Sequence, residues 1–246
     1  MNEILRTTLI GLFFGTFGTT IGGIIGITFK NTSNKFLSFI LEFAAGLMIS
    51  IVCFDLVPEA MELSSLSITF LGIFLGVGCM IICDSAIKDK FNSKAGIKKN
   101  NSLLKTGIVV GIGLALHNFP EGLAIGSGFG ASFKLGISLA LAIALHDVPE
   151  GISMAVPMKS GGMKPTRALL LTFASGITTG IGAFFGAILG SVSQSLISLC
   201  LAFAAGAMLY IVSGELIPES NKLYRGRIAS IGNILGFVLG IVAIQL

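Results

Sequence analysis

Charged residues are scarce in this chain: Asp, Glu, Lys and Arg make up 11% of 246 residues, whereas hydrophobic residues make up 53%. A soluble domain carries about 25% charged residues, so the composition excludes an ordinary soluble protein and indicates an all-α integral membrane protein. Trp is absent and Tyr occurs twice, so the aromatic belts that often mark membrane interfaces are thin. The net charge of +4 is too small to favour nucleic acid as a partner.

Cysteine is also scarce, and all four cysteines fall within apolar segments: Cys53, Cys79, Cys83 and Cys200. We expect them to pack as small hydrophobic residues, and no disulfide framework is predicted. Cys79 and Cys83 share a helix face beside Asp84, where packing is favoured over a site for a soft metal.

Long apolar runs fill the rest of the sequence. About 20 apolar residues span a bilayer, which predicts a single transmembrane domain over residues 1–246. Its eight spans are expected at about 5–29, 36–57, 66–87, 106–130, 134–157, 167–190, 194–217 and 228–246. The connections are short except for a polar, basic loop at 88–105.

The basic residues predict how the spans are oriented. Eight spans leave two alternating sets of connections, and 14 of the 16 Lys and Arg residues lie in one set. Because positive residues collect on the cytoplasmic side, we expect a multi-pass protein of the cell membrane with both termini outside and the 88–105 loop in the cytoplasm. Glu42, close to the cytoplasmic end of its span, is expected to be solvated.

An internal repeat runs through the chain at a constant offset of 160 residues. The segment FAAGLMISIVCFDLVPEA (43–60) matches FAAGAMLYIVSGELIPES (203–220), so the first three spans correspond to the last three. An odd number of spans separates each pair, which gives the two copies opposite orientations. The sequence therefore predicts an inverted repeat arranged as 3 + 2 + 3 spans, a design common in secondary transporters.

The central two spans carry nearly identical motifs, LALHNFPEG (114–122) and IALHDVPEG (143–151). Their polar residues are His117, Asn118 and Glu121 in the first motif and His146, Asp147 and Glu150 in the second. Residues three and four apart share a helix face, so each motif presents an imidazole and carboxylate or amide oxygens together. Each histidine follows the nearest lysine by twelve residues, about 18 Å of helix, which places both motifs near the bilayer midplane.

Proline and glycine complete both motifs. Pro120 and Pro149 cannot donate a backbone hydrogen bond, so each is expected to kink its helix and free a carbonyl one turn earlier. The glycines that follow, Gly122 and Gly151, permit close approach of a neighbouring helix.

Charged groups at this depth indicate function, because burying them costs roughly 2.5–3.5 kcal/mol each on insertion scales. A single histidine would more often make an interhelical hydrogen bond, but two matching motifs favour a divalent metal. Imidazole with carboxylates suits zinc, iron, manganese or cadmium rather than sodium or potassium. We therefore expect a divalent metal as transported substrate, with no separate cofactor.

Three functions fit these residues. The first is a metal transporter, not an enzyme, that alternates access to a midplane site. The second is an intramembrane metal-dependent hydrolase, which needs a metal-bound water and a general base as in HExxH. Here Asn118 or Asp147 follows the first histidine, and no nucleophile is evident. The third is a divalent cation channel that uses the same ligands.

With HNFPEG and HDVPEG in adjacent spans, the sequence resembles the ZIP (Zrt-, Irt-like protein) family of divalent metal transporters, and most closely its bacterial GufA-like branch. The resemblance covers essentially the whole chain. It implies import of zinc, often also iron, manganese or cadmium, into the cytoplasm, and frequently a homodimer within the lipid bilayer.

The resemblance also implies ligands. A first metal site would use His117, Glu121 and Glu150, helped by Met48, although simple packing is an equal alternative for Met48. A second site would use Asn118 and Asp147, with the same two glutamates as bridges. His146 matches a motif position, and its role as a direct ligand stays open.

One departure from the family pattern concerns the sixth span. Family members of this branch often carry Glu-Pro after a Ser-Gly, whereas Thr179 and Gly180 occupy those positions here. The second site therefore lacks a carboxylate.

Four further acids lie near span ends: Asp55, Glu59, Glu215 and Glu219. They are either ligands at the entrance and exit of the pathway or solvated helix ends.

Overall fold

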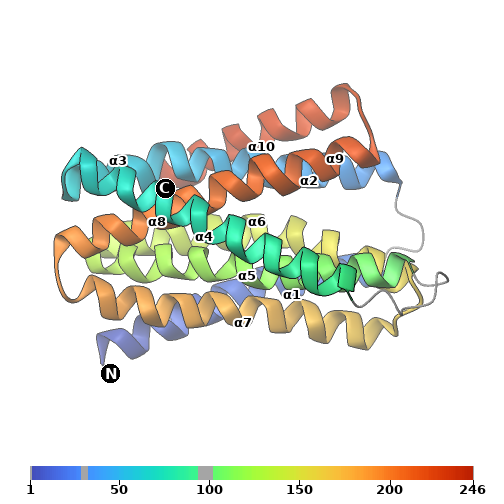
Figure 1. Cartoon of the computed structure of the whole chain (residues 1–246), viewed down its shortest axis with the longest axis horizontal. Helices are drawn as coiled ribbons and strands as arrows, with labels where there is room; N and C mark the ends of the chain where they lie inside the picture. Colours follow the sequence, from blue (N-terminus) through green and yellow to red (C-terminus); the bar gives the residue numbers. More distant parts are fainter. Residues whose placement is uncertain (1, 29–32, 94–101, 246) are drawn as a thin grey trace.

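The computed structural model describes residues 2–28, 33–93 and 102–245, and all regular structure in these ranges is helical (Figure 1). The helices are α1 (Glu3–Thr28), α2 (Asn34–Ile51), α3 (Val57–Leu63), α4 (Leu66–Ser93), α5 (Ser102–Ala131), α6 (Phe133–Ser160), α7 (Pro165–Gly190), α8 (Gln194–Ile211), α9 (Ile217–Leu223) and α10 (Arg227–Gln245). Short π-helical segments, η1 (Val52–Leu56) and η3 (Val212–Leu216), join α2 to α3 and α8 to α9. When each α-helix joined by a π-helical segment is counted as one helix, six helices among the described residues are long and apolar enough to cross a membrane. The chain is therefore an all-helical, multi-pass membrane protein.

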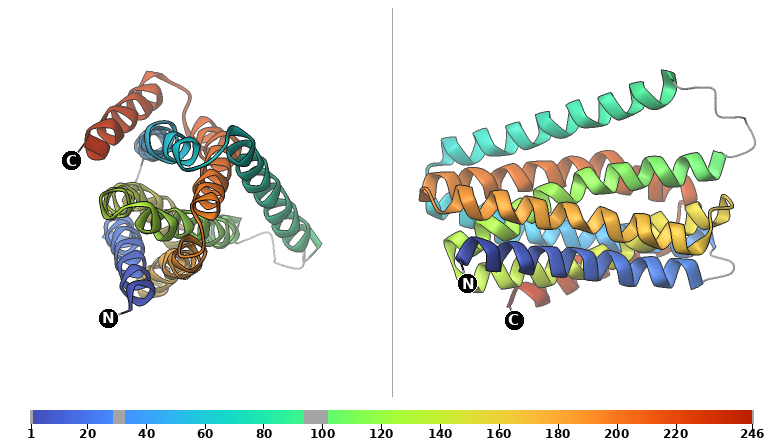
Figure 2. Two further views of the ribbon diagram at one scale, coloured as in Figure 1. Left: turned by 90° about the vertical axis from the view of Figure 1, so that its left-hand side faces the viewer. Right: turned by 90° about the horizontal axis from the view of Figure 1, so that it is seen from below.

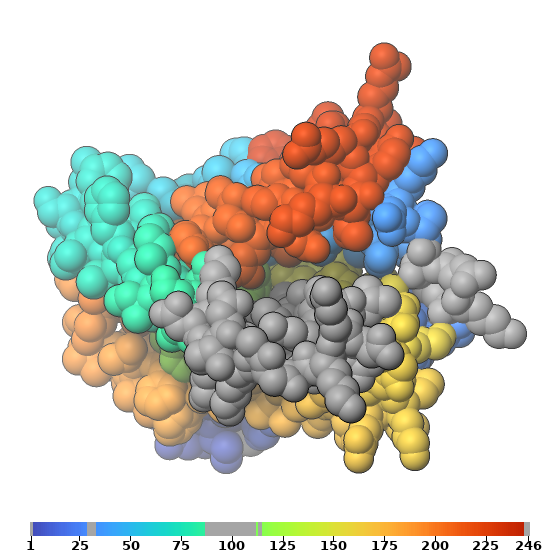
Figure 3. Space-filling view, turned by 45° about the vertical axis from the view of Figure 1, so that its right-hand side comes forward, coloured from blue at the N-terminus to red at the C-terminus, as the bar shows by residue number. Residues whose placement is uncertain are grey.

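The helices pack as two sets. In one, α5 packs on α7 and α6, while α1 packs on α6 and α7. In the other, α10 packs on α2, and α4 and α3 pack on α8. The left view of Figure 2 shows both sets end-on, and Figure 3 shows α8 and α9 above α7 and the start of α1 at the surface. The sets meet where α8 contacts α5 and α2 contacts α6, around a core rich in alanine, leucine and methionine.

Glycine brings the backbones of the first set into direct contact. A Cβ atom added to Gly122 of α5 would lie 1.9 Å from the carbonyl oxygen of Thr179 on α7. A Cβ atom added to Gly22 of α1 would lie 2.1 Å from the carbonyl oxygen of Val148 on α6. Only a residue without a side chain permits these crossings, which hold the two motif-bearing segments against α7 and α1.

The second and seventh predicted spans share a helix irregularity. The π-helical turn η1 precedes Pro58, and the N–H of Val57 donates to the carbonyl of Val52, five positions earlier. Segment η3 precedes Pro218 and has the same bond 160 positions later in the chain. A proline lacks the N–H of the regular ladder and crowds the preceding turn, which accounts for a wider turn at both places.

Specific contacts also recur at this offset. The hydroxyls of Ser38 and Ser220 are hydrogen-bonded at 2.8 Å, and the hydroxyl of Ser198 donates to the carbonyl of Ala60 at 2.7 Å. Ser38 and Ser198 are 160 residues apart, as are Ala60 and Ser220. Helices α3 and α9 lie at opposite ends of the molecule, so the two related stretches run in opposite directions (Figure 1).

Glu42 is not solvated as expected. Its side chain is buried on α2, and its carboxylate accepts a hydrogen bond of 3.0 Å from the amide of Asn233 on α10. Helix α10 covers this face of α2, and the amide supplies the polar partner that a buried carboxylate requires.

One other local feature differs from the sequence-based expectation. Helix α4 continues to Ser93 and α5 begins at Ser102, so helix extends into both ends of the predicted 88–105 loop, and residues 94–101 lie outside the described ranges. Pro120 and Pro149 lie inside α5 and α6, and both helices continue beyond them.

Candidate metal centre

The two motifs meet where α5 packs against α6. His117 and Glu121 of α5 and His146 and Glu150 of α6 each offer one ligand atom, and these atoms all lie within 4.8 Å of one another. All four side chains are at least 99% buried. The helical spacing of four residues places each His–Glu pair on one face, and helix packing turns the two faces toward each other.

The carboxylate of Glu121 is the centre of this cluster. Its Oε1 atom lies 2.9 Å from Nε2 of His117 and 2.7 Å from Nε2 of His146. The Nε2 atom of His117 also lies 2.9 Å from Oε1 of Glu150. Two imidazoles and two carboxylates from two helices therefore converge within a space suited to one cation.

The donor atoms fit a divalent metal. Zinc binds histidine nitrogen and carboxylate oxygen at about 2.0–2.2 Å in a tetrahedron, which separates the ligands by about 3.4 Å. Nε2 of His117 approaches two carboxylates but has hydrogen-bond geometry to neither, and both Glu150 oxygens also have no hydrogen-bond partner among the described residues. Burying such groups is costly unless a countercharge satisfies them, and a metal ion would supply that countercharge.

Two neighbouring motif residues flank the cluster. The side-chain amide of Asn118 donates to the backbone carbonyl of Ser175 on α7 at 3.0 Å. Oδ1 of Asp147 lies 3.6 Å from Nε2 of His146, and within the described part of the chain neither Asp147 oxygen has a hydrogen-bond partner. Both side chains are fully buried. The contact with the Ser175 carbonyl could not be predicted from the sequence, because every residue has a backbone carbonyl and no residue type marks this one.

The remaining candidates lie outside the four-residue cluster. Met48 is fully buried in the core on α2, which packs against α6. Thr179 is fully buried on α7, where its side chain occupies the space beside Gly15 of α1. The structure therefore buries both residues in the interior of the bundle.

The four acids near the span ends occupy related positions. Asp55 and Glu215 lie in the π-helical segments η1 and η3, and Glu59 and Glu219 lie in the helices that follow. Asp55 is 9% exposed, and one of its carboxylate oxygens has no hydrogen-bond partner among the described residues. Glu219 instead forms a surface ion pair of 2.9 Å with Lys222.

Comparison with known proteins identifies the family. Residues 88–246 match the family described as ZIP zinc transporter. The chain is 32% identical to the zinc transporter ZupT of Clostridium perfringens, in an alignment that covers 100% of this chain and 97% of that protein. The chain belongs to the ZIP family. This ZIP protein is also 37% identical to the zinc transporter GufA of Myxococcus xanthus, over 70% of this chain and 66% of the relative. It is a transporter rather than an enzyme, which excludes the hydrolase alternative.

Proposed function

We propose that this ZIP protein imports divalent transition metal ions, with zinc as the main substrate and iron, manganese or cadmium as others, into the cytoplasm across the cell membrane. The observation that carries the proposal is the buried cluster of His117, Glu121, His146 and Glu150, whose donor atoms lie within 4.8 Å of one another. Together with Asp147, the cluster holds three carboxylates and two histidines in the interior of the bundle. A divalent ion would offset this negative charge, whereas a monovalent ion would leave most of it uncompensated.

The four cluster residues would hold one ion, and Asn118 and Asp147 would contact it as it moves or bind a second one. Met48 would contribute a thioether ligand from α2. The unpartnered oxygens of Asp147 and Asn118 support this role, since polar atoms buried at this depth normally have partners. Asp55 and Glu59 would act at the outer end of the pathway, and Glu215 and Glu219 at the inner end.

The helices would form eight spans in the 3 + 2 + 3 inverted arrangement, with both termini outside and the basic 88–105 segment in the cytoplasm. The paired serine contacts, the twin π-helical turns and the opposite directions of the related stretches support the inverted repeat. Such symmetry gives two interconvertible states that open the same site to opposite sides of the membrane. We therefore favour a carrier over a channel. The family resemblance further implies a homodimer.

Uptake into proteoliposomes tests this function. With a pH-sensitive dye inside the vesicles, zinc, iron, manganese and cadmium are each added outside, and metal entry and proton movement are recorded together. We expect saturable zinc uptake with slow turnover. Fast, non-saturating, conductive flux would support the channel instead, and no uptake of any of the four metals would contradict the proposal.

Thr179 offers a test of the second site. We expect Thr179→Glu to raise the bound zinc from one to two ions per chain, because it places a carboxylate at the buried position of α7 where family members of this branch often carry one. Metal content of the purified protein, measured by mass spectrometry, checks this result. Thr179→Gln is the matched control, with the same length and no charge, and should keep one ion. A single ion in both variants would contradict a second site.

A further inference from the structure

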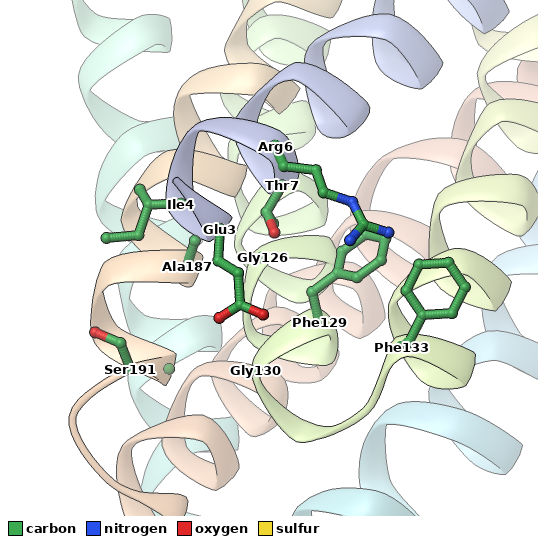
Figure 4. A pocket seen from close by; sticks show the side chains of 11 residues that line it. Glu3, Ile4, Arg6, Thr7, Gly126, Phe129, Gly130, Phe133, Ala187 and Ser191 are labelled. Carbon is green, nitrogen blue, oxygen red and sulfur yellow. The ribbon is translucent and has the colours of Figure 1, made fainter. Parts of the chain in front are cut away.

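A pocket of about 330 Å³ lies at the end of the molecule that carries the N-terminus (Figures 1 and 4). It is enclosed by the first turns of α1 and α6 and the last turns of α5 and α7. The side chains that give it its chemistry are Glu3, Arg6, Thr7, Phe129, Phe133 and Ser191. Its residues are separate from the metal cluster and have no part in the function proposed above.

The pocket presents opposite charges on opposite sides. Figure 4 shows the Glu3 carboxylate on the side of Ser191, and the Arg6 guanidinium on the side of Phe133. The Arg6 guanidinium carbon lies 5.2 Å from the centre of the Phe133 ring. Within the described ranges, neither charged group has an ion-pair partner. A ligand with both a positive and a negative group would complement the two sides.

One further feature points to a polar ligand. Thr7 is 7% exposed, its hydroxyl turns into the pocket, and it makes no hydrogen bond within the described part of the chain (Figure 4). Helices α5 and α7 end here, at Ala131 and Gly190, and α1 and α6 begin here, at Glu3 and Phe133, so the partial charges of the helix ends oppose one another and the Glu3 and Arg6 side chains set the charge of each side. A cationic group is therefore favoured beside Glu3, and an anionic group beside Arg6 and Thr7.

The depth of the pocket places it among lipid headgroups. Helix α1 has 26 residues and is about 39 Å long, whereas the hydrocarbon core of a bilayer is about 30 Å thick. Residues in its first turn therefore lie in the interfacial layer. A ligand bound there has access to the surrounding lipid.

An apolar groove lies about one turn further along α1 than the pocket. A second cavity of about 290 Å³ lies between α1 and α7 and is lined by Leu12, Ile181 and Phe184, with Thr8 and Gly180. Ile4 of the pocket, Thr8 and Leu12 are spaced four residues apart on one face of α1, so the cavities follow each other along that face. The Thr8 hydroxyl donates to the carbonyl of Ile4 at 2.7 Å and offers the groove no free donor.

We propose that this pocket and groove bind one phosphatidylethanolamine molecule from the leaflet at this end of the protein. The ammonium group lies against Glu3, the phosphate against Arg6 and Thr7, and one acyl chain fills the groove along Thr8 and Leu12. Phosphatidylglycerol lacks a cation for Glu3, and the quaternary amine of phosphatidylcholine has no N–H to donate. The site is thus selective for a primary-amine headgroup.

Native mass spectrometry of the purified full-length protein, titrated with equal mixtures of phosphatidylethanolamine and phosphatidylglycerol, tests the site. We expect the wild type to prefer phosphatidylethanolamine by about tenfold, the effect of one charged hydrogen bond. Glu3→Gln should abolish this preference, and Thr7→Val should weaken phosphatidylethanolamine binding at almost unchanged side-chain volume. Thr8→Phe, which fills the groove, should weaken retention of the lipid but not of soluble phosphoethanolamine.

The control is Glu62→Gln, which removes an exposed carboxylate of α3 at the same end of the molecule and should leave the preference unchanged. Equal retention of both lipids by the wild type would overturn the proposal, and this test does not depend on whether any variant folds. A preference that survives in a folded Glu3→Gln protein would also overturn it. If soluble phosphoethanolamine binds as tightly as the lipid, the acyl chain has no site and the proposal fails.

Discussion

Replacing Glu121 with Gln is expected to reduce zinc uptake into proteoliposomes by at least about a hundredfold. The Glu121 carboxylate lies within 2.9 Å of both imidazoles, so it is the proposed ligand that the two motif helices share. Gln keeps the shape and one oxygen but removes the charge that holds a divalent ion between α5 and α6. Because the variant also removes the charge from the buried contact of Glu121 with Nε2 of His146, its thermal stability without metal should be lower than that of the wild type.

Two results would separate loss of the site from loss of the fold. Glu62→Gln, which changes an exposed glutamate in the same way, should transport at the wild-type rate. The thermal stabilisation by added zinc should be large for the wild type and absent for Glu121→Gln. Normal uptake by a folded Glu121→Gln protein would show that the four-residue cluster is not the transport site.

Replacing Gly122 with Ala is expected to destabilise the protein by about 1–3 kcal/mol and to reduce uptake by up to about a hundredfold. The added Cβ atom would lie 1.9 Å from the Thr179 carbonyl oxygen, a distance that forces α5 and α7 apart. Since Glu121 is the adjacent residue, this displacement moves a proposed metal ligand by a large part of an ångström. Uptake assays and thermal unfolding of the purified protein measure the two effects.

Gly78→Ala is the matched control for this change. Gly78 lies inside α4, and a Cβ atom there would meet nothing within 4 Å. Alanine should therefore stabilise the helix slightly, by about 0.5–1 kcal/mol, and leave uptake unchanged. Equal stability and uptake in both variants would mean that the close crossing of α5 and α7 has no role in holding the metal centre.

The metal centre shows how far the sequence leads. The spacing of His117 and Glu121, and of His146 and Glu150, predicts that each pair shares a helix face. It does not predict how each helix is rotated against its neighbour, which left the role of His146 open. In the structure His146 joins the cluster, while Asn118 turns its amide to a carbonyl of α7.

Contacts between remote segments were less predictable. Glu42 looked like a solvated acid because its position is close to a helix end, yet Asn233, 191 residues later, covers it and bonds to it. Nothing in the local pattern at either residue signals this contact. The pocket that holds Glu3 and Arg6 was equally unpredictable from the local pattern, because residues of four helices line it.

The membrane class, the motif residues and the 160-residue repeat follow from the sequence alone, because they depend on composition, periodicity and residue identity along the chain. Which polar side chains converge, and which turn away from the cluster, follows only from the folded structure. That choice depends on helix rotation and on crossings at glycine, such as Gly122 against Thr179 and Gly22 against Val148. These contacts join segments far apart in sequence, and they set the position of each ligand atom to within a fraction of an ångström.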